Sequence, residues 1–374
     1  MRWASILLFF SHWGLAEPLD SSESSASPRR VERLVLWRPD VKGIRYVIPK
    51  LINETAAEMM SRWQSALKKS ATYSQMQHTQ NVSLSTDRST FLPISSSSFE
   101  HPNVVVILNR PSQMTTAASY IKTVLDSFEK EGPRLFAVPL GLELVLTPDE
   151  LLEFRKLLNE FDGQLGVGGD DPHPHLYGEK TLGLTEGDIS VERDLIQSAY
   201  MQEYLENGKG RVFYICGSMQ RAAIQDGWGF HPDVSALSAT PQRSHDGVVL
   251  VEVQVDPDSE LALAAGSIRF QTSNFHHAGI NESVTLPGKN PMSRITAYNI
   301  EPDGTRGKIV KSIEFPDNRG FATQFHPEFR GSKEEERIIK YVATGWQMRA
   351  RVGAQAILKC MERTRAPNAV KKVN

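Results

Sequence analysis

The sequence has little cysteine and almost no excess of charge of either sign. Only two of its 374 residues are cysteine, Cys216 and Cys360, so a framework of disulfide bonds is excluded as the basis of the fold. The 42 basic and 44 acidic residues give a net charge of −2, and no basic block is interleaved with aromatic residues. Nucleic acid is therefore not an expected partner.

Long hydrophobic runs are also missing. The apolar run at residues 6–10 is far too short to span a membrane, and no other segment reaches transmembrane length. Arg2 before this run and the small residues "GLA" after it are typical of a cleaved secretory signal. We therefore expect residues 1–16 to be a signal peptide and the protein to be secreted or periplasmic. The alternative is an unstructured N-terminus of a cytoplasmic protein.

An apolar fraction of 40% is enough for a sizeable core, and the pattern of the chain changes near residue 102. Residues 17–101 combine polar, Ser-rich stretches with a few short apolar runs, so we expect an N-terminal extension and linker. Beyond them, apolar runs alternate with helical stretches, which predicts a parallel sheet with crossover helices. The expected strands are residues 103–108, 134–140, 163–169 and 211–216, and the expected helices are 113–131, 147–161 and 190–209.

The second half of the chain contains more segments with strand-like alternation. A helical segment at 333–364 then closes the domain, and residues 365–374 form a tail. We expect an α/β domain over residues 102–364, with a parallel core sheet flanked by helices and a β-rich second half. The later expected strands are residues 247–255, 268–273, 293–300, 308–315 and 321–325.

Residues suited to catalysis stand where expected strands end. The carboxyl ends of parallel strands are the usual place for such groups, which points to Gly168, Gly169 and Cys216. A nucleophilic cysteine needs an imidazole that keeps it ionised, and a group that orients the imidazole. The stretch "QFHPEF" offers His326 and Glu328, two residues apart, where side chains on a strand share one face.

Five stretches in a fixed order carry a family resemblance. With them, residues 103–330 resemble the class I glutamine amidotransferase superfamily, and within it the γ-glutamyl-γ-aminobutyrate hydrolase, or peptidase C26-like, branch. The resemblance implies the flavodoxin-like α/β fold of that superfamily. The stretches are "GVGGDDPHPHLYGE" (166–179), "ERDLIQSAYMQEYLENGK" (192–209), "ICGSMQ" (215–220), "SNFHHAGI" (273–280) and "QFHPE" (324–328).

The resemblance implies a catalytic triad at three matched positions. Cys216 would attack a γ-glutamyl amide carbonyl and form a thioester acyl-enzyme. His326 would be the general base and acid, and Glu328 would orient it. Hydrolysis would release glutamate and an amine.

Substrate-binding roles are implied as well. The backbone N–H of Gly217, together with that of Gly169 or its neighbour Gly168, would form an oxyanion hole. His276 and His277 would contact the substrate.

The expected partner is a small γ-glutamyl substrate, and a homo-oligomer stays an open question. Four histidines could be interpreted as a metal site, but their spacing shows no helical or strand-paired set with supporting carboxylates, so no metal is expected. These histidines are His173, His175, His276 and His277. No other cofactor is expected either.

Three residues near the cysteine depart from the family pattern. Tyr214 and Ser218 stand two positions before and after Cys216, where the family usually has small residues, and Gly217 replaces a usual arginine. Such a turn is strained, and small flanking residues relieve the crowding. The Tyr214 ring must therefore leave the turn or fill space that another change has opened.

Three functions stay open at the level of the sequence. The first is a hydrolase of γ-glutamyl amides. The second is a hydrolase of another γ-linked peptide, which an exported location favours. The third is a binding or scaffold protein with an impaired triad, which Tyr214 favours and the intact Cys216, His326 and Glu328 oppose.

Overall fold

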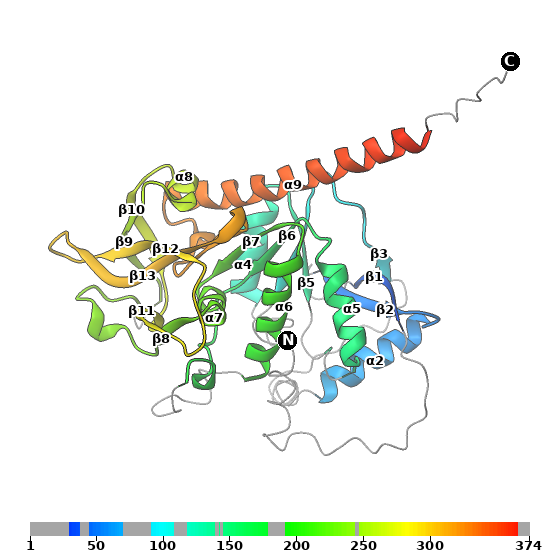
Figure 1. Ribbon diagram of the computed structural model, residues 1–374, viewed down its shortest axis with the longest axis horizontal. Coiled ribbons are helices and arrows are strands. Elements are labelled where there is room, and N and C mark those ends of the chain that lie inside the picture. The colour runs from blue at the N-terminus through cyan, green and yellow to red at the C-terminus, as the bar shows by residue number, and fades with distance from the viewer. Residues whose placement is uncertain are drawn as a thin grey trace.

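The computed structural model describes residues 30–37, 45–69, 91–107, 118–138, 142, 145–178, 191–243 and 247–365 of the chain. Within them, a central sheet carries helices on both of its faces (Figure 1). The signal peptide predicted at residues 1–16 lies outside the described residues, as does all but the first residue of the predicted tail.

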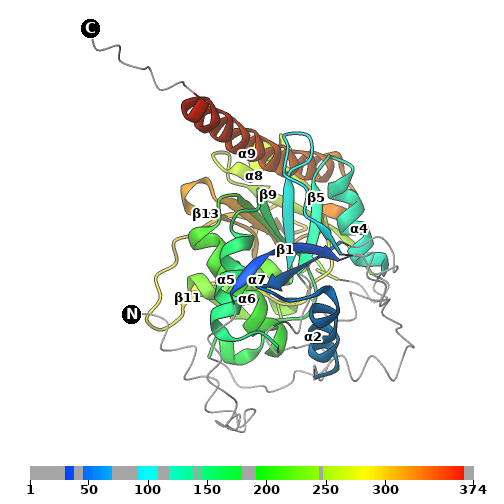
Figure 2. The same ribbon diagram turned by 90° about the vertical axis from the view of Figure 1, so that its right-hand side faces the viewer.

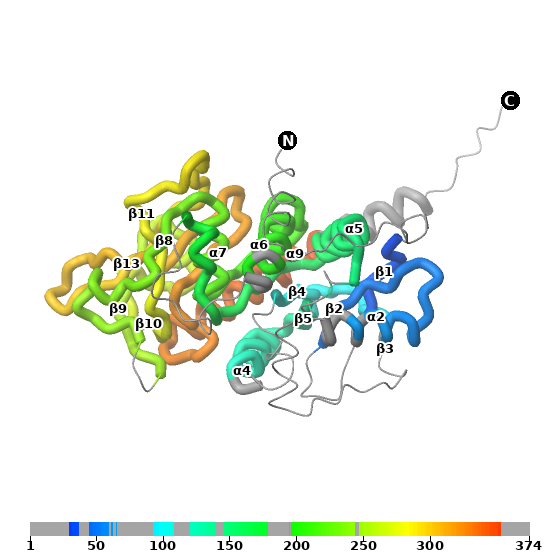
Figure 3. Tube along the Cα trace, turned by 90° about the horizontal axis from the view of Figure 1, so that it is seen from below, coloured from blue at the N-terminus to red at the C-terminus, as the bar shows by residue number. Residues whose placement is uncertain are grey.

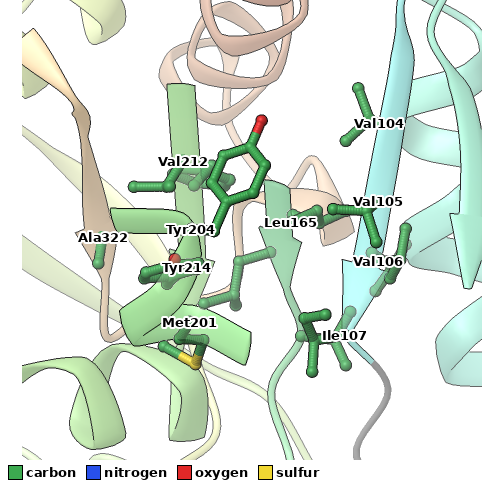
Figure 4. Packing of buried hydrophobic residues seen from close by; sticks show 14 of the residues in the cluster. Val104, Val105, Val106, Ile107, Leu165, Met201, Tyr204, Val212, Tyr214 and Ala322 are labelled. Carbon is green, nitrogen blue, oxygen red and sulfur yellow. The ribbon is translucent and has the colours of Figure 1, made fainter. Parts of the chain in front are cut away.

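Six neighbouring strands at the centre of the sheet run parallel, which confirms the predicted core. All residues of β4 are buried, as a continuous apolar run predicts for a strand covered on both faces. Val105 and Val106 of this strand lie beside Leu165 of β6 (Figure 4). The parallel strands, in spatial order, are β2 (Tyr46–Leu51), β5 (Arg134–Val138), β4 (Asn103–Ile107), β6 (Gly163–Gly166), β7 (Arg211–Ile215) and β14 (Gly320–Thr323).

Antiparallel strands extend this core on both sides into one sheet of twelve strands. On the β14 side, β13, β12, β9 and β10 make up most of the predicted β-rich half. On the β2 side, β1 and β3 complete the sheet. The sheet thus continues into the segment predicted as an N-terminal extension, because β2 pairs with β5. The bounds are β1 (Val31–Trp37), β3 (Phe91–Pro93), β9 (Val249–Val255), β10 (Arg269–Asn274), β12 (Arg294–Ile300) and β13 (Arg306–Phe315), with β8 (Trp228–His231) and β11 (Gly279–Thr285) in a separate two-stranded sheet.

Helices α5, α6 and α7 lie on one face of the sheet, and α4 lies on the other (Figure 3). The turned view likewise places the sheet between α4 and the α5–α6 pair (Figure 2). Helix α5 begins at the start of the predicted helix 147–161, with Pro148 in its first turn and a capping box between Thr147 and Glu150. The α-helices are α2 (Ala56–Lys69), α4 (Ala118–Glu129), α5 (Pro148–Leu158), α6 (Val191–Asn207), α7 (Gly217–Asp226), α8 (Glu260–Ala265) and α9 (Lys333–Arg365), and the short 3₁₀ turns are η4 (Pro174–Leu176), η5 (Ser235–Leu237), η6 (Pro316–Asn318) and η7 (Pro327–Phe329).

The long closing helix α9 confirms the predicted helical segment at 333–364. It packs on α4 and β7 through buried residues such as Ile339 and Trp346, and its far end extends beyond the sheet (Figure 1). Over the part of the chain that is described, none of the helices combines the length and hydrophobicity that a membrane crossing requires.

This topology fixes where a site can form. Strands β6, β7 and β14 are adjacent and parallel, so their carboxyl ends lie side by side. Gly168 follows β6, Cys216 follows β7 and His326 follows β14. Segments that are far apart in the sequence therefore converge at one edge of the sheet.

Candidate active site

Cys216 occupies a sharp turn between β7 and α7. Its backbone has φ 50° and ψ −112°, a conformation that a residue with a side chain adopts only at a cost in energy. Two hydrogen bonds hold the turn: Cys216 N donates to Thr323 O at 2.7 Å, and Gln220 N donates to Cys216 O at 3.0 Å. The thiol is free and buried, and it lies at the N-terminus of α7, where a negative charge is favoured.

The neighbouring strands accommodate the unexpected Tyr214. Its register partners are Gly166 on β6 and Ala322 on β14, which are both small. A Cβ on Gly166 would lie 2.8 Å from Tyr214 Cδ1, so the ring uses the space that this glycine leaves. The hydroxyl donates to Gln164 Oε1 at 2.5 Å, and the ring packs edge-on against Phe315. Tyr214 therefore belongs to the packing between strands (Figure 4).

Ser218, the second departure, joins three parts of the site. Its hydroxyl donates to Val167 O at 2.6 Å and accepts from Gln197 Nε2 at 2.5 Å. Val167 directly precedes the glycine pair, and Gln197 lies on α6. A glycine at this position could form neither bond, so the serine ties α7 to the glycine loop and to α6.

The predicted pair of His326 and Glu328 is formed. Nδ1 of His326 lies 2.8 Å from Glu328 Oε1, and both side chains are buried. Since a carboxylate only accepts hydrogen bonds, Nδ1 carries a proton and Nε2 is directed to other partners. The backbone is held as well: His326 N donates to Ser273 O at 2.7 Å, and the Ser273 hydroxyl donates to the buried carboxylate of Glu335 at 3.0 Å.

His326 and Cys216 approach each other across Gly168. A Cβ on Gly168 would lie 2.8 Å from His326 Cε1 and 3.2 Å from Cys216 Cβ, so these two atoms are within about 6 Å of each other. Among the described residues, His326 Nε2 has no aligned hydrogen-bond partner. Catalytic hydrogen bonds are often poorly aligned before substrate binds, and the arrangement suits a thiol–imidazole pair of this kind.

Electrostatics favour an imidazolium at His326. Burial lowers the pKa of the ring, but the negative charges of Glu328 and Cys216 together raise it by more than burial lowers it. The resulting pKa is about 10. The ring is therefore an imidazolium near neutral pH. An adjacent positive charge favours the thiolate, which is the nucleophilic form of a cysteine.

Tyr120 on α4 belongs to the site, although the sequence analysis did not identify it. Its hydroxyl donates to Glu328 Oε1 at 2.9 Å and accepts from Gly168 N at 3.1 Å, and its ring is edge-on to His326. Burial and then the charge of Glu328 raise its pKa well above the ordinary value, so it stays a donor. No local motif marks this residue, because it is one aromatic position in an amphipathic helix.

Gln324, inside the recognised "QFHPE" stretch, also reaches the nucleophile. Its Nε2 donates to Cys216 Sγ at 3.5 Å, and its Oε1 accepts from Gln220 Nε2 at 3.3 Å. The second bond orients the amide so that its donor side faces the sulfur. A thiolate at Cys216 thus has a neutral donor in addition to the imidazolium.

Of the three glycines predicted for the oxyanion hole, Gly168 and Gly217 lie against the nucleophile, and Gly169 follows Gly168 in the chain. Gly168 N–H is already engaged by Tyr120 Oη. Gly217 is the first residue of α7, and Gly169 has φ 139°, a value that only glycine adopts without strain. The N–H groups of Gly217 and Gly169 therefore stay the predicted oxyanion donors.

A buried ion pair anchors the loop that follows Gly169. Arg221 and Asp194 are both inaccessible to solvent and form a 2.5 Å salt bridge. Arg221 also donates to the backbone carbonyls of Asp170 at 2.8 Å and Asp171 at 3.0 Å, while Asp194 accepts from His173 N. Because this pair is buried and fully bonded, the loop is fixed relative to α6 and α7.

The two histidines predicted to contact substrate lie in different surroundings. His276 is buried, with Nδ1 2.9 Å from Ala278 O and Nε2 2.8 Å from Lys311 Nζ. Both of its nitrogens therefore have protein partners. His277 is partly exposed, and its Nε2 lies 2.8 Å from Asp171 Oδ2, which joins the "NFHH" stretch to the glycine loop. Substrate contact stays a prediction for both.

The histidines do not assemble into a metal centre within the described ranges. No group of three or more His, Cys, Asp or Glu side chains there is arranged to hold a metal ion. His173 and His175 stack on each other, with ring centroids 4.8 Å apart. His173 Nδ1 accepts from His175 N, which gives this pair a role in the turn η4.

The part of the chain that holds this site matches a known family. Residues 108–328, more than half of the chain, match the model of the family Peptidase C26. The fold and the matched region define a cysteine-type amide hydrolase of the class I glutamine amidotransferase-like superfamily. Within that superfamily, the chain belongs to the peptidase C26 family.

Individual relatives are distant. The glutamine amidotransferase-like protein YvdE of Lactococcus lactis is 26% identical over 220 residues, which cover 55% of this chain and 84% of that protein. The glutaminase domain of Trypanosoma brucei CTPS is 19% identical with a TM-score of 0.46, covering 67% of this chain and 94% of that one. A protein described as a component of GMP synthase from Thermoplasma acidophilum is 14% identical with a TM-score of 0.43, over 69% and 98%. Neither structural likeness bears on the chemistry of the site.

Gly168→Ala tests the approach of the catalytic groups. The new methyl would lie 2.8 Å from both His326 Cε1 and Tyr120 Oη, so the imidazole must move. We expect alkylation of Cys216 by iodoacetamide at neutral pH to slow by about tenfold or more. The free energy of unfolding should fall by about 1–3 kcal/mol.

The matched control is Gly279→Ala, whose methyl would meet only Val234 Cγ1 at 3.2 Å. Its alkylation rate should equal that of the wild type. A wild-type rate in Gly168→Ala as well would contradict the geometry described here.

The protonation of His326 gives a second prediction. Because its folded pKa of about 10 exceeds the ordinary value of 6.5, its contribution to stability is complete below pH 6.5 and is lost as the pH rises through about 10. Ring resonances in NMR should titrate near pH 10, and Glu328→Gln should lower this midpoint. Wild-type resonances that titrate near pH 6.5 would show that the ring is not paired with the two negative charges.

Proposed function

We propose that this protein hydrolyses γ-glutamyl amide bonds through Cys216, His326 and Glu328, releasing glutamate and an amine. The observation that carries the proposal is the convergence of Cys216 and His326 on Gly168, with Glu328 bonded to the far nitrogen of the imidazole. The family of the chain supports an amide as the bond that is cleaved. The γ-glutamyl moiety is supported by the five stretches that resemble the γ-glutamyl-γ-aminobutyrate hydrolase branch.

The first half of the reaction uses the thiolate and the imidazolium. Cys216 Sγ attacks the amide carbonyl carbon, and the N–H groups of Gly217 and Gly169 receive the developing oxyanion. His326 donates its Nε2 proton to the leaving nitrogen, the C–N bond breaks, and the amine departs. The γ-glutamyl group is left as a thioester on Cys216.

The second half returns the enzyme to its starting state. Neutral His326 accepts a proton from water through Nε2, and the hydroxide attacks the thioester carbonyl. The C–S bond then breaks, which releases glutamate and restores the thiolate beside the imidazolium. Throughout, Glu328 holds the Nδ1 proton, and Tyr120 holds Glu328.

The scaffold alternative loses its main support. Tyr214 favoured an impaired triad because its ring was expected to crowd the turn. That ring instead packs beside Gly166 and bonds to Gln164. Hydrolysis of a different γ-linked peptide stays the second candidate, since both candidates need the same catalytic groups.

A substrate panel tests the proposed function. Wild-type protein should release glutamate from one or more γ-glutamyl amides or peptides, measured by a coupled glutamate assay. Cys216→Ser should abolish turnover and leave the circular dichroism spectrum unchanged, because serine has a similar volume but is not ionised near neutral pH. Cys360→Ser, at the only other cysteine, is the matched control and should keep full activity.

The panel and the thiol chemistry separate the alternatives. A reactive Cys216 with no cleavage of any γ-glutamyl compound would rule out the γ-glutamyl assignment and leave the other γ-linked peptides. Turnover that survives Cys216→Ser would rule out the mechanism itself.

Glu328→Gln should be less damaging than the loss of Cys216. The amide keeps a hydrogen-bond partner for Nδ1 but removes the charge that stabilises the imidazolium. We expect kcat to fall by roughly 10²-fold or more, with residual activity above that of Cys216→Ser. Equal and complete loss in both variants, with both folded, would mean that Glu328 does more than orient the histidine.

A further inference from the structure

Lys311 is a fully buried lysine in the β-rich half, next to the proposed site. It lies on β13, and its Nζ forms three hydrogen bonds: to Gln242 Oε1 at 2.6 Å, to Asn274 Oδ1 at 2.5 Å and to His276 Nε2 at 2.8 Å. A lysine is rarely this buried unless its charge has partners. The triad chemistry does not use this residue.

Each of the three acceptors is held in orientation by a second bond. The Nε2 atom of Gln242 and the Nδ2 atom of Asn274 both donate to backbone carbonyls, so their oxygens face the lysine. Nδ1 of His276 also faces a carbonyl and therefore carries the ring proton, which leaves a lone pair on Nε2. The carbonyls that accept these bonds belong to Thr240, Thr272 and Ala278.

The arrangement of acceptors matches an ammonium group. An ammonium has three N–H donors for these three acceptors, whereas a neutral amine has two donors and would turn its lone pair toward one acceptor. Burial lowers the pKa of Lys311 well below its ordinary value, and the negative charge of Cys216 opposes this. The acceptors and a thiolate at Cys216 thus favour the same charged form.

One strand, β14, lies between Lys311 on β13 and Cys216 at the end of β7. Its carbonyl accepts from Gln324 N at 2.9 Å, and the Gln324 side chain donates to Cys216 Sγ. Among the described groups, the titratable ones that act on Lys311 are Cys216 at the end of β7 and His276 between β10 and β11. Since the coupling of two charges is mutual, an ammonium at Lys311 also favours a thiolate at Cys216.

We propose that Lys311 is a positioning residue: its positive charge favours a thiolate at Cys216, and its three hydrogen bonds fix Gln242 and the Asn274–His276 segment. The thiolate then has two cations near it, the imidazolium of His326 and the ammonium of Lys311. The inference rests on the proposed role of Cys216 as nucleophile, but not on the identity of the substrate.

The test is the pH profile of Cys216 alkylation by iodoacetamide, measured in a Cys360→Ser background. Lys311→Met keeps most of the side-chain volume and removes the charge. We expect the midpoint of the profile to rise by about one pH unit, which slows alkylation about tenfold on the acid side of the midpoint. The plateau rate at high pH should be unchanged.

Ser312→Ala is the matched control, because Ser312 is the next residue on β13, is buried and bonds to Ala322 O at 2.8 Å. It should lower the melting temperature and leave the profile unmoved. An unmoved profile in folded Lys311→Met would overturn the proposal. The same shift in both variants would also overturn it, because a general loosening of the strand would then explain the effect.

A second variant covers the case in which Lys311→Met does not fold. Gln242→Met keeps the lysine but removes one acceptor from the ammonium, so the midpoint should shift in the same direction by less. An unmoved profile in this variant would then overturn the proposal. No substrate enters these measurements, so failure of the γ-glutamyl panel and failure of this proposal are distinguishable.

Discussion

The hydrogen bond from Cys216 N to Thr323 O is the contact on which the rest of the site depends. It joins the end of β7 to the end of its parallel neighbour β14, and it holds Cys216 in a backbone conformation that the residue would otherwise avoid. His326 lies shortly after the end of β14, beyond Gln324 and Phe325. The same pairing of strands therefore sets both the strained turn of the nucleophile and the starting point of the imidazole.

The sequence predicted those parts of this arrangement that depend on short stretches of neighbouring residues. Continuous apolar runs such as residues 103–107 are the signature of strands buried on both faces, and the cap at Thr147 marks the start of α5. The Cys216 turn and the His326–Glu328 pair could also be recognised, because each is a short motif at the end of a strand.

Other features could not be predicted, because they depend on pairings between distant segments. The alternation at residues 321–325 indicates a strand, but nothing local says that it lies parallel to β7. Tyr120 reads as an ordinary aromatic residue of a helix, yet it bonds to Glu328 and Gly168. The crowding expected at Tyr214 was judged from the turn alone, whereas the space that resolves it belongs to Gly166 on the next strand. In each case, the missing information was which strand or helix lies beside the residue.

Charge balance explains how so polar a site can be buried. In the proposed charge state, Glu328 and a thiolate at Cys216 are negative, and an imidazolium at His326 and an ammonium at Lys311 are positive, so the two negative charges are matched by two positive ones. The proposed reaction preserves this balance. While the tetrahedral intermediate exists, the negative charge moves from sulfur to oxygen without leaving the site. When the thioester forms and that charge disappears, His326 has given its proton to the departing amine, and one positive charge disappears in the same step. A group that could not lose its charge, such as an arginine in place of His326, would leave an unpaired cation in the acyl-enzyme. The titratable imidazole is therefore the member of this set that suits catalysis.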